Sequence, residues 1–124
     1  MKNLCMGILL FLSLFVYNET ASAACVGSGF QYGNISGNPA AQSQVVTDGA
    51  TCTAQVRFFQ ATHDSASIVK KPKNGDLTQI NVYTFEYNPK KNFKGTDEYV
   101  VKFCGAENTG AKGCVTVSYF VTIK

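Results

Sequence analysis

The chain contains a single histidine, and an acid and a hydroxyl follow it directly as His63, Asp64 and Ser65. These residue types match the base, the orienting acid and the nucleophile of a hydrolase triad. Catalysis requires such groups to converge on one bond, whereas three adjacent residues in one polar loop point in different directions. We therefore expect a solvated turn here.

Acidic residues offer a second possible chemistry. Glu86, Asp97 and Glu98 could supply the carboxylate pair that glycoside hydrolysis uses. Asp97 and Glu98 could also contribute to a calcium site, but such a site takes six or more oxygen ligands and no further acids accompany them. We expect exposed strand and turn acids, no cofactor and no enzymatic activity.

Four of the five cysteines lie beyond the N-terminal apolar segment that contains Cys5; they are Cys25, Cys52, Cys104 and Cys114. A zinc site is one interpretation of four cysteines, but zinc-binding sequences contain close C-x₂₋₄-C pairs that are missing here. An even number of cysteines in an exported chain indicates two disulfides, for which three pairings exist.

The alternation of side chains selects one pairing. From Glu98 to Cys104 and from Cys114 to Ile123, bulky apolar residues alternate with more polar ones, and each cysteine falls on the more polar face. The turn-rich segment between them favours a hairpin. Cys104 and Cys114 can then face each other across adjacent antiparallel strands, which leaves Cys25 to pair with Cys52.

The N-terminus has the features of a secretion signal. Lys2 precedes the apolar run Leu4–Val16, and Ala21-Ser22-Ala23 provides the small residues of a cleavage site. The sequence predicts a signal peptide at residues 1–23 and a single domain at 24–124. A lipoprotein signal ending at Cys25 is the alternative, but Ser22 stands where such signals usually carry Leu. The protein is therefore expected to be secreted or periplasmic, with no membrane span.

The remaining sequence is typical of short strands separated by turn signals. Strands are expected at residues 44–47, 51–59, 66–70, 77–80, 82–87, 98–104 and 114–123. No window of comparable length shows a helical apolar period, so the fold class is expected to be an all-β sandwich. The net charge of +3 comes from small lysine groups in turns, and we expect no nucleic-acid partner.

A specific resemblance rests on the segment from Ile68 to Ile123. It contains Pro72 and Gly75, then Tyr83-Thr84-Phe85-Glu86-Tyr87-Asn88-Pro89, and then Asn92-Phe93-Lys94-Gly95-Thr96-Asp97-Glu98-Tyr99. In this order the residues resemble the bacterial cadherin-like, immunoglobulin-like domains that form repeats in surface adhesins. The resemblance implies a Greek-key sandwich of about seven strands. The two disulfides and the single domain are closer to the small secreted versions of that family.

The residues of this segment also have direct physical interpretations. Phe93 can close one end of the sandwich, and Gly95 suits a backbone position with positive φ. Asp97 can accept hydrogen bonds from nearby backbone N–H groups.

One surface is a candidate for binding. Val100 and Phe120 fall on the same side of the last hairpin as the polar residues, and Tyr32 and Phe59 could extend an apolar patch there. The alternative is that segment 30–39 folds over Val100 and Phe120. We expect a non-enzymatic recognition or adhesion module that binds a protein or glycan surface; a secreted inhibitor or toxin-neutralising protein and a small hydrolase are the alternatives.

The disulfide assignment can be tested by peptide mapping without reduction. We expect one peptide pair linked through Cys104 and Cys114 and another through Cys25 and Cys52. A link between Cys52 and Cys104 would contradict the assignment.

Overall fold

The structure is a computed structural model that describes Cys25, residues 29–32 and residues 34–124. The expected signal peptide at 1–23 lies outside the described residues. The described residues form strands and contain no helix. They therefore include no helix long and apolar enough to span a membrane. The strands are β1 (Gly29–Tyr32), β2 (Ala40–Thr47), β3 (Cys52–Phe58), β4 (Ser65–Lys70), β5 (Gly75–Asn81), β6 (Thr84–Pro89), β7 (Gly95–Ala106) and β8 (Lys112–Ile123).

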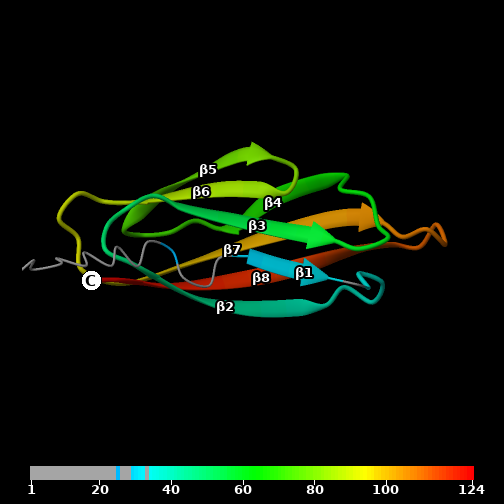
Figure 1. Ribbon diagram of the computed structural model, residues 1–124, viewed down its shortest axis with the longest axis horizontal. Coiled ribbons are helices and arrows are strands. Elements are labelled where there is room, and N and C mark those ends of the chain that lie inside the picture. Colours follow the sequence, from blue (N-terminus) through cyan, green and yellow to red (C-terminus); the bar gives the residue numbers. More distant parts are fainter. Residues whose placement is uncertain (1–24, 26–28, 33) are drawn as a thin grey trace, which may run out of the picture.

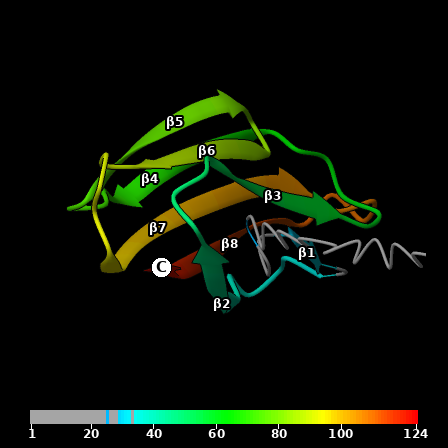
Figure 2. The same cartoon turned by 60° about the vertical axis from the view of Figure 1, so that its left-hand side comes forward.

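The strands form two sheets that pack face to face (Figures 1 and 2). One sheet has the order β1-β3-β6-β5 and the other the order β2-β8-β7-β4. Most neighbours are antiparallel, but β1 pairs with β3 and β2 pairs with β8 in parallel. The prediction of an all-β sandwich with two disulfides is confirmed.

The core lies between the sheets and follows the alternation in the sequence. Every second residue of β7 and β8 points inward, as expected of strands with one buried face. The buried aromatic residues are Phe85, Tyr87, Tyr99, Phe103 and Tyr119. Three of them, Tyr87, Tyr99 and Tyr119, stack in sequence with ring centroids 5.4 and 4.8 Å apart.

The longest strand pair carries one disulfide on its outer face. β7 and β8 pair without a register shift from Gly95 opposite Ile123 to Ala106 opposite Lys112. Cys104 and Cys114 are directly opposite each other and are bonded, with Cα atoms 4.1 Å apart. The predicted pairing is confirmed because no bulge in either strand changes which face a side chain occupies.

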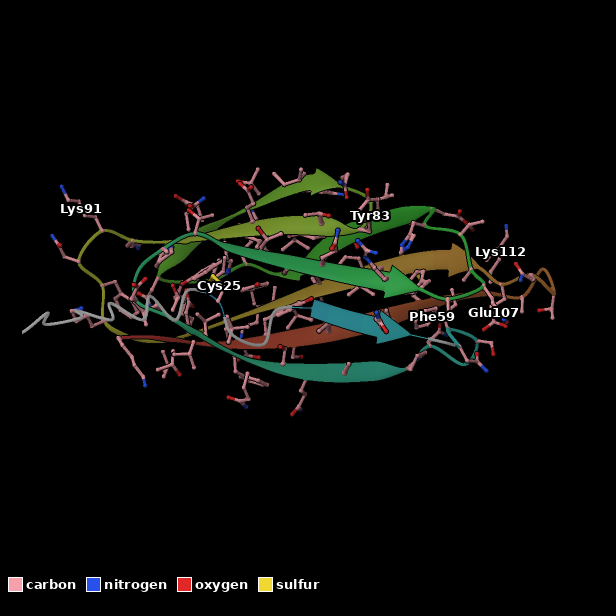
Figure 3. The ribbon with its side chains drawn as sticks, in the orientation of Figure 1. Cys25, Phe59, Tyr83, Lys91, Glu107 and Lys112 are labelled. Atoms are coloured by element: carbon pink, nitrogen blue, oxygen red, sulfur yellow. A yellow bond between two sulfur atoms is a disulfide. The ribbon has the colours of Figure 1, made fainter. Side chains whose placement is uncertain are left out.

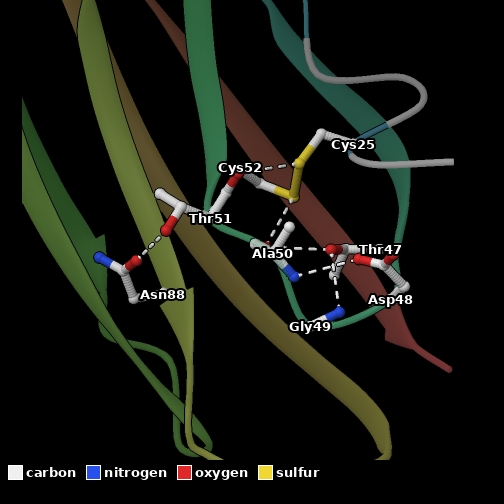
Figure 4. Close-up of a disulfide and its surroundings, with 8 residues drawn as sticks. All are labelled: Cys25, Thr47, Asp48, Gly49, Ala50, Thr51, Cys52 and Asn88. Atoms are coloured by element: carbon white, nitrogen blue, oxygen red, sulfur yellow. Dashed lines mark hydrogen bonds between the residues drawn. A yellow bond between two sulfur atoms is a disulfide. The ribbon is translucent and has the colours of Figure 1, made fainter. Parts of the chain in front are cut away.

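The second predicted disulfide, Cys25–Cys52, is also present (Figure 4). Cys52 is buried at the start of β3, and the backbone N–H of Cys25 donates to the carbonyl of Val46 in β2 at 3.0 Å. Cys25 therefore contacts a strand of each sheet. Thr51, beside this disulfide, donates a hydroxyl hydrogen bond to the Asn88 side chain at the end of β6.

Three details differ from expectation. β1 was not predicted, because four residues give too short an alternation to recognise. Val82 and Tyr83 were predicted to begin a strand, but they form the turn between β5 and β6, where the Asn81 side chain accepts the N–H of Tyr83 at 3.0 Å. The turn at Asn74-Gly75 does not form a hairpin, since β4 and β5 belong to opposite sheets.

Two glycines allow loops to pack closely against the β7–β8 hairpin. Gly105 and Gly113 are opposite each other in the register. A Cβ on Gly105 would lie 1.7 Å from the carbonyl oxygen of Thr62, and one on Gly113 would lie 1.9 Å from that of Ile35. Any larger residue would therefore push the β3–β4 or the β1–β2 loop away from the sheet.

A buried carboxylate connects the two sheets at the opposite end. Asp97 in β7 is only 8% exposed. It accepts hydrogen bonds from the backbone N–H groups of Lys73 and Asn74, both at 3.0 Å, and from the Tyr87 hydroxyl of β6 at 2.7 Å. The predicted capping role of Asp97 is confirmed, and it extends to a side chain of the other sheet.

The neighbouring residues behave as their types suggest. Phe93 is half-buried and packs against the core. Gly95 has a φ of 141°, and a Cβ at this position would lie 3.3 Å from the Phe93 ring. Burial, together with the hydrogen bond to Asp97, raises the pKa of Tyr87. Its hydroxyl therefore stays protonated and remains a donor to the carboxylate.

Asp97→Asn should destabilise the fold strongly. The amide has one acceptor oxygen in place of two, so at least one buried donor loses its partner, at a cost of about 1–3 kcal/mol, or more where the lost acceptor was charged. Urea unfolding measures the difference. Glu98→Gln is the matched control: it changes the adjacent carboxylate, which is on the outer face, and should alter stability by less than about 1 kcal/mol. Equal stability of both variants would contradict this role of Asp97.

Candidate functional site

One row of side chains crosses the outer face of the β2-β8-β7-β4 sheet. Phe120 of β8 is opposite Gln44 of β2 on one side and Glu98 of β7 on the other. The row continues onto β4, because Lys70 Nζ lies 3.0 Å from Glu98 Oε2. Each of the four strands therefore contributes one side chain: an amide, an aromatic ring, a carboxylate and an ammonium group.

This row forms the floor of a groove of about 460 Å³. Lys73 and Asn74, in the connection between β4 and β5, line it as well, together with the hydroxyl-bearing residues Thr96 and Thr122. We call this feature the Phe120 groove. Its volume lies within the range of about 300–1,000 Å³ that is usual for ligand sites.

The buried carboxylate described above also shapes this groove. Asp97 holds the backbone of Lys73 and Asn74, and both residues line the groove. The next residue in β7, Glu98, points to the outer face because side chains alternate along a strand. Two adjacent acids thus have different tasks: Asp97 fixes the connection, and Glu98 belongs to the groove floor.

The ion pair of the groove is exposed to solvent. The side chains of Lys70 and Glu98 are 48% and 38% exposed. An exposed pair of this kind contributes at most about 1 kcal/mol to stability. Its two charged groups can therefore separate at little cost and bind other polar groups.

The structure brings together two of the four residues predicted to form an apolar patch. Phe120 and Val100 are both half-buried on the outer face, with Val100 opposite Ser118, the residue two positions before Phe120. Phe59 is 54% exposed but follows β3 in the other sheet, and it lies at the end of the sandwich that carries Glu107 (Figure 3). The side chain of Tyr32 is outside the described part of the structure.

In the alternative interpretation, segment 30–39 covers Val100 and Phe120. The backbone of this segment, where it is described, lies elsewhere. β1 pairs with β3 of the opposite sheet. Beyond it, the backbone N–H groups of Ile35 and Ser36 both donate to the Glu107 side chain in the β7–β8 connection, at 2.9 and 3.1 Å. This part of the segment therefore packs at the hairpin end.

His63 does not lie in a fully solvated turn, so that expectation is wrong. Its ring is half-buried and stacks on Phe58, with centroids 4.6 Å apart, and it also contacts Tyr83 at 5.2 Å. Its Nε2 accepts the backbone N–H of Phe58 at 3.3 Å. Burial lowers the pKa of His63 and outweighs the nearby Asp64 carboxylate, which raises it. The imidazole therefore holds the β3–β4 loop.

The carboxylates considered for glycoside chemistry do not meet. Asp97 points into the core and Glu98 points to the outer face of the same strand. Glu86 belongs to β6 in the other sheet. In the part of the chain that the structure describes, no group of three or more His, Cys, Asp or Glu side chains could hold a metal ion.

Sequence reasoning missed Gln44 and Lys70 as members of the groove. Gln44 alternates with the inward-facing Ser43 and Val45, so its outward direction can be read from the sequence, but its position beside Phe120 depends on the parallel pairing of β2 with β8. Lys70 carries no local signal. Comparison with protein-family models and with curated proteins found no match to this chain.

His63 should make stability depend on pH between about 5 and 7. Its pKa is lowered in the folded state, so the unfolded chain, with a histidine pKa near 6.5, binds more protons in this range. The contribution of His63 is complete above the unfolded pKa and is lost as the pH falls through the folded pKa.

Urea unfolding at pH 7.5 and pH 5.0 measures this effect in the wild type and in His63→Gln. Glutamine does not titrate, and its amide oxygen can accept the Phe58 N–H. The wild type should lose more stability on acidification than the variant. An identical loss in both proteins would show that His63 does not titrate with folding.

Proposed function

We propose that this chain is a non-enzymatic recognition module that binds a protein or glycan surface through the Phe120 groove and the adjoining outer face. The groove itself is the observation that carries this proposal. It combines a half-buried aromatic ring with an amide, a carboxylate and an ammonium group in one row across four strands. Binding sites typically combine apolar surface with a few placed polar groups.

The strand order supports a cadherin-like, immunoglobulin-like assignment. Apart from β1, seven strands form two sheets with the orders β3-β6-β5 and β2-β8-β7-β4. In the second sheet, β2 is parallel to β8. Such an arrangement suits a Greek-key sandwich of that class. The resemblance partly rests on three residues that have structural roles here: Phe93 packs against the core, Gly95 has a positive φ, and Asp97 accepts backbone hydrogen bonds. We infer that this domain is a relative of the adhesin repeats.

The two disulfides favour an oxidising compartment. Together with the signal-like N-terminus, they support a secreted or periplasmic protein. Small exported domains often use disulfides because their hydrophobic cores are small. The two disulfides would keep the proposed binding surface in place outside the cytoplasm.

The placement of the reactive side chains supports a role without catalysis. His63 Nε2 accepts a backbone hydrogen bond, and Asp97 is surrounded by backbone and hydroxyl donors. Glu98 pairs with Lys70 on an open face. Each group is thus engaged in a contact that maintains the fold or the groove.

The proposal predicts that Val100→Asp combined with Phe120→Asp abolishes binding. Wild-type and variant proteins are immobilised and compared for capture of binding partners from an envelope extract. An aromatic group at the centre of an interface contributes about 2 kcal/mol or more, so the loss of Phe120 alone should lower capture by at least about thirtyfold.

Phe59→Asp is the matched control, because Phe59 is an exposed aromatic at the far end of the sandwich. Its capture should equal that of the wild type. Phe120→Ala is a milder second variant, and circular dichroism verifies the fold of each protein. Full capture by folded Phe120→Ala and by the double variant would refute the proposal.

A further inference from the structure

The chemistry around Phe120 suits a sugar more than a protein interface. Protein interfaces bury about 800 Å² per partner, and their centres are apolar and depleted of charged residues. The large apolar side chains that are exposed in the described chain are Phe59, Val69 and Ile80, and none of them lines the Phe120 groove. Phe120 is half-buried and forms part of the groove floor instead of a projection, and Val100, also half-buried, is not among the residues that line the groove.

Phe120 is the aromatic residue among those that line the groove, and an aromatic ring offers a face on which a ligand can stack. An aromatic face carries negative charge density and attracts positively polarised hydrogens. A pyranose ring has such hydrogens, since several C–H bonds point to one side of it. Stacking on a single aromatic ring is therefore available to a sugar.

The polar groups around Phe120 complement hydroxyl groups. A sugar hydroxyl both donates and accepts a hydrogen bond. Gln44 offers a donor and an acceptor, Glu98 offers two acceptor oxygens, and Lys70 offers donors. Gln44 and Glu98 are opposite Phe120 on its two sides, so hydroxyls on both edges of a stacked ring meet a partner.

We propose that the Phe120 groove binds a saccharide, with one sugar ring stacked on Phe120 and its hydroxyls bound by Gln44, Glu98 and Lys70. This inference rests on the proposed function, because it names the ligand class of the same groove. The groove volume of about 460 Å³ suits one or two sugar rings of a longer chain, since small-ligand sites span about 300–1,000 Å³.

The test uses the mature protein and four soluble probes: cellotetraose, chitotetraose, mannotetraose and a tetragalacturonide. Binding is measured by titration calorimetry and by NMR shifts of the Phe120 ring signals. We expect at least one probe to bind and to shift those signals. Phe120→Ala should weaken binding at least tenfold, a loss of about 1.4 kcal/mol. Phe120→Tyr, which keeps the ring, should bind within about threefold of the wild type, because the stacking face is unchanged.

Two further variants locate the site. Gln44→Ala should weaken binding because it removes the amide that donates and accepts hydrogen bonds on one side of Phe120. Phe59→Ala should leave binding unchanged, since Phe59 lies at the other end of the sandwich.

Several outcomes would overturn the inference. If none of the probes binds, but Phe120→Ala abolishes capture of a protein, the saccharide assignment is wrong while the proposed recognition function stands. If a probe binds equally well to wild type and to folded Phe120→Ala, the Phe120 groove is not the saccharide site. If Phe120→Ala changes neither saccharide binding nor protein capture, both the inference and the proposed use of this face fail.

Discussion

The carboxylate of Asp97 links three parts of the molecule that are separate in the sequence. It is held in β7 and binds the backbone that leads from β4 to β5, and it binds the Tyr87 hydroxyl of β6. β7 and β4 belong to one sheet, and β5 and β6 to the other. A buried charge is stable only when donors surround it, so the crossing between the sheets must keep its position for Asp97 to remain satisfied. The Phe120 groove depends on the same condition, because the crossing lines it.

Much of the sandwich follows from local pattern. The inward faces of β7 and β8 and both disulfides could be predicted because these strands pair without a bulge, so the period of two in the sequence equals the period of two in space. That Asp97 accepts backbone hydrogen bonds could be predicted from its residue type close to a turn, whereas its donors, Lys73 and Asn74, come from the distant β4–β5 connection. In these places local and long-range preferences agree.

The remaining features depend on contacts that no local pattern encodes. Val82 and Tyr83 are residues that favour strands, yet they form a turn because the β5 bulge and the Asn81 side chain reverse the chain there. His63 is half-buried only because Phe58 and Tyr83 flank it in space. The groove combines Gln44 with Phe120, which come together through the pairing of an early strand with the last one. Side-chain faces were therefore predictable, whereas neighbours across strands were not.

The edge strands β4 and β5 share one irregularity. Each end strand shifts register against its neighbour, between Ile68 and Lys70 in β4 and between Gln79 and Asn81 in β5. An incoming strand needs a regular row of backbone donors and acceptors, and a bulge interrupts that row. These two edges consequently resist the strand-by-strand addition that builds fibrils, so this side of the sandwich can remain open to solvent without promoting aggregation.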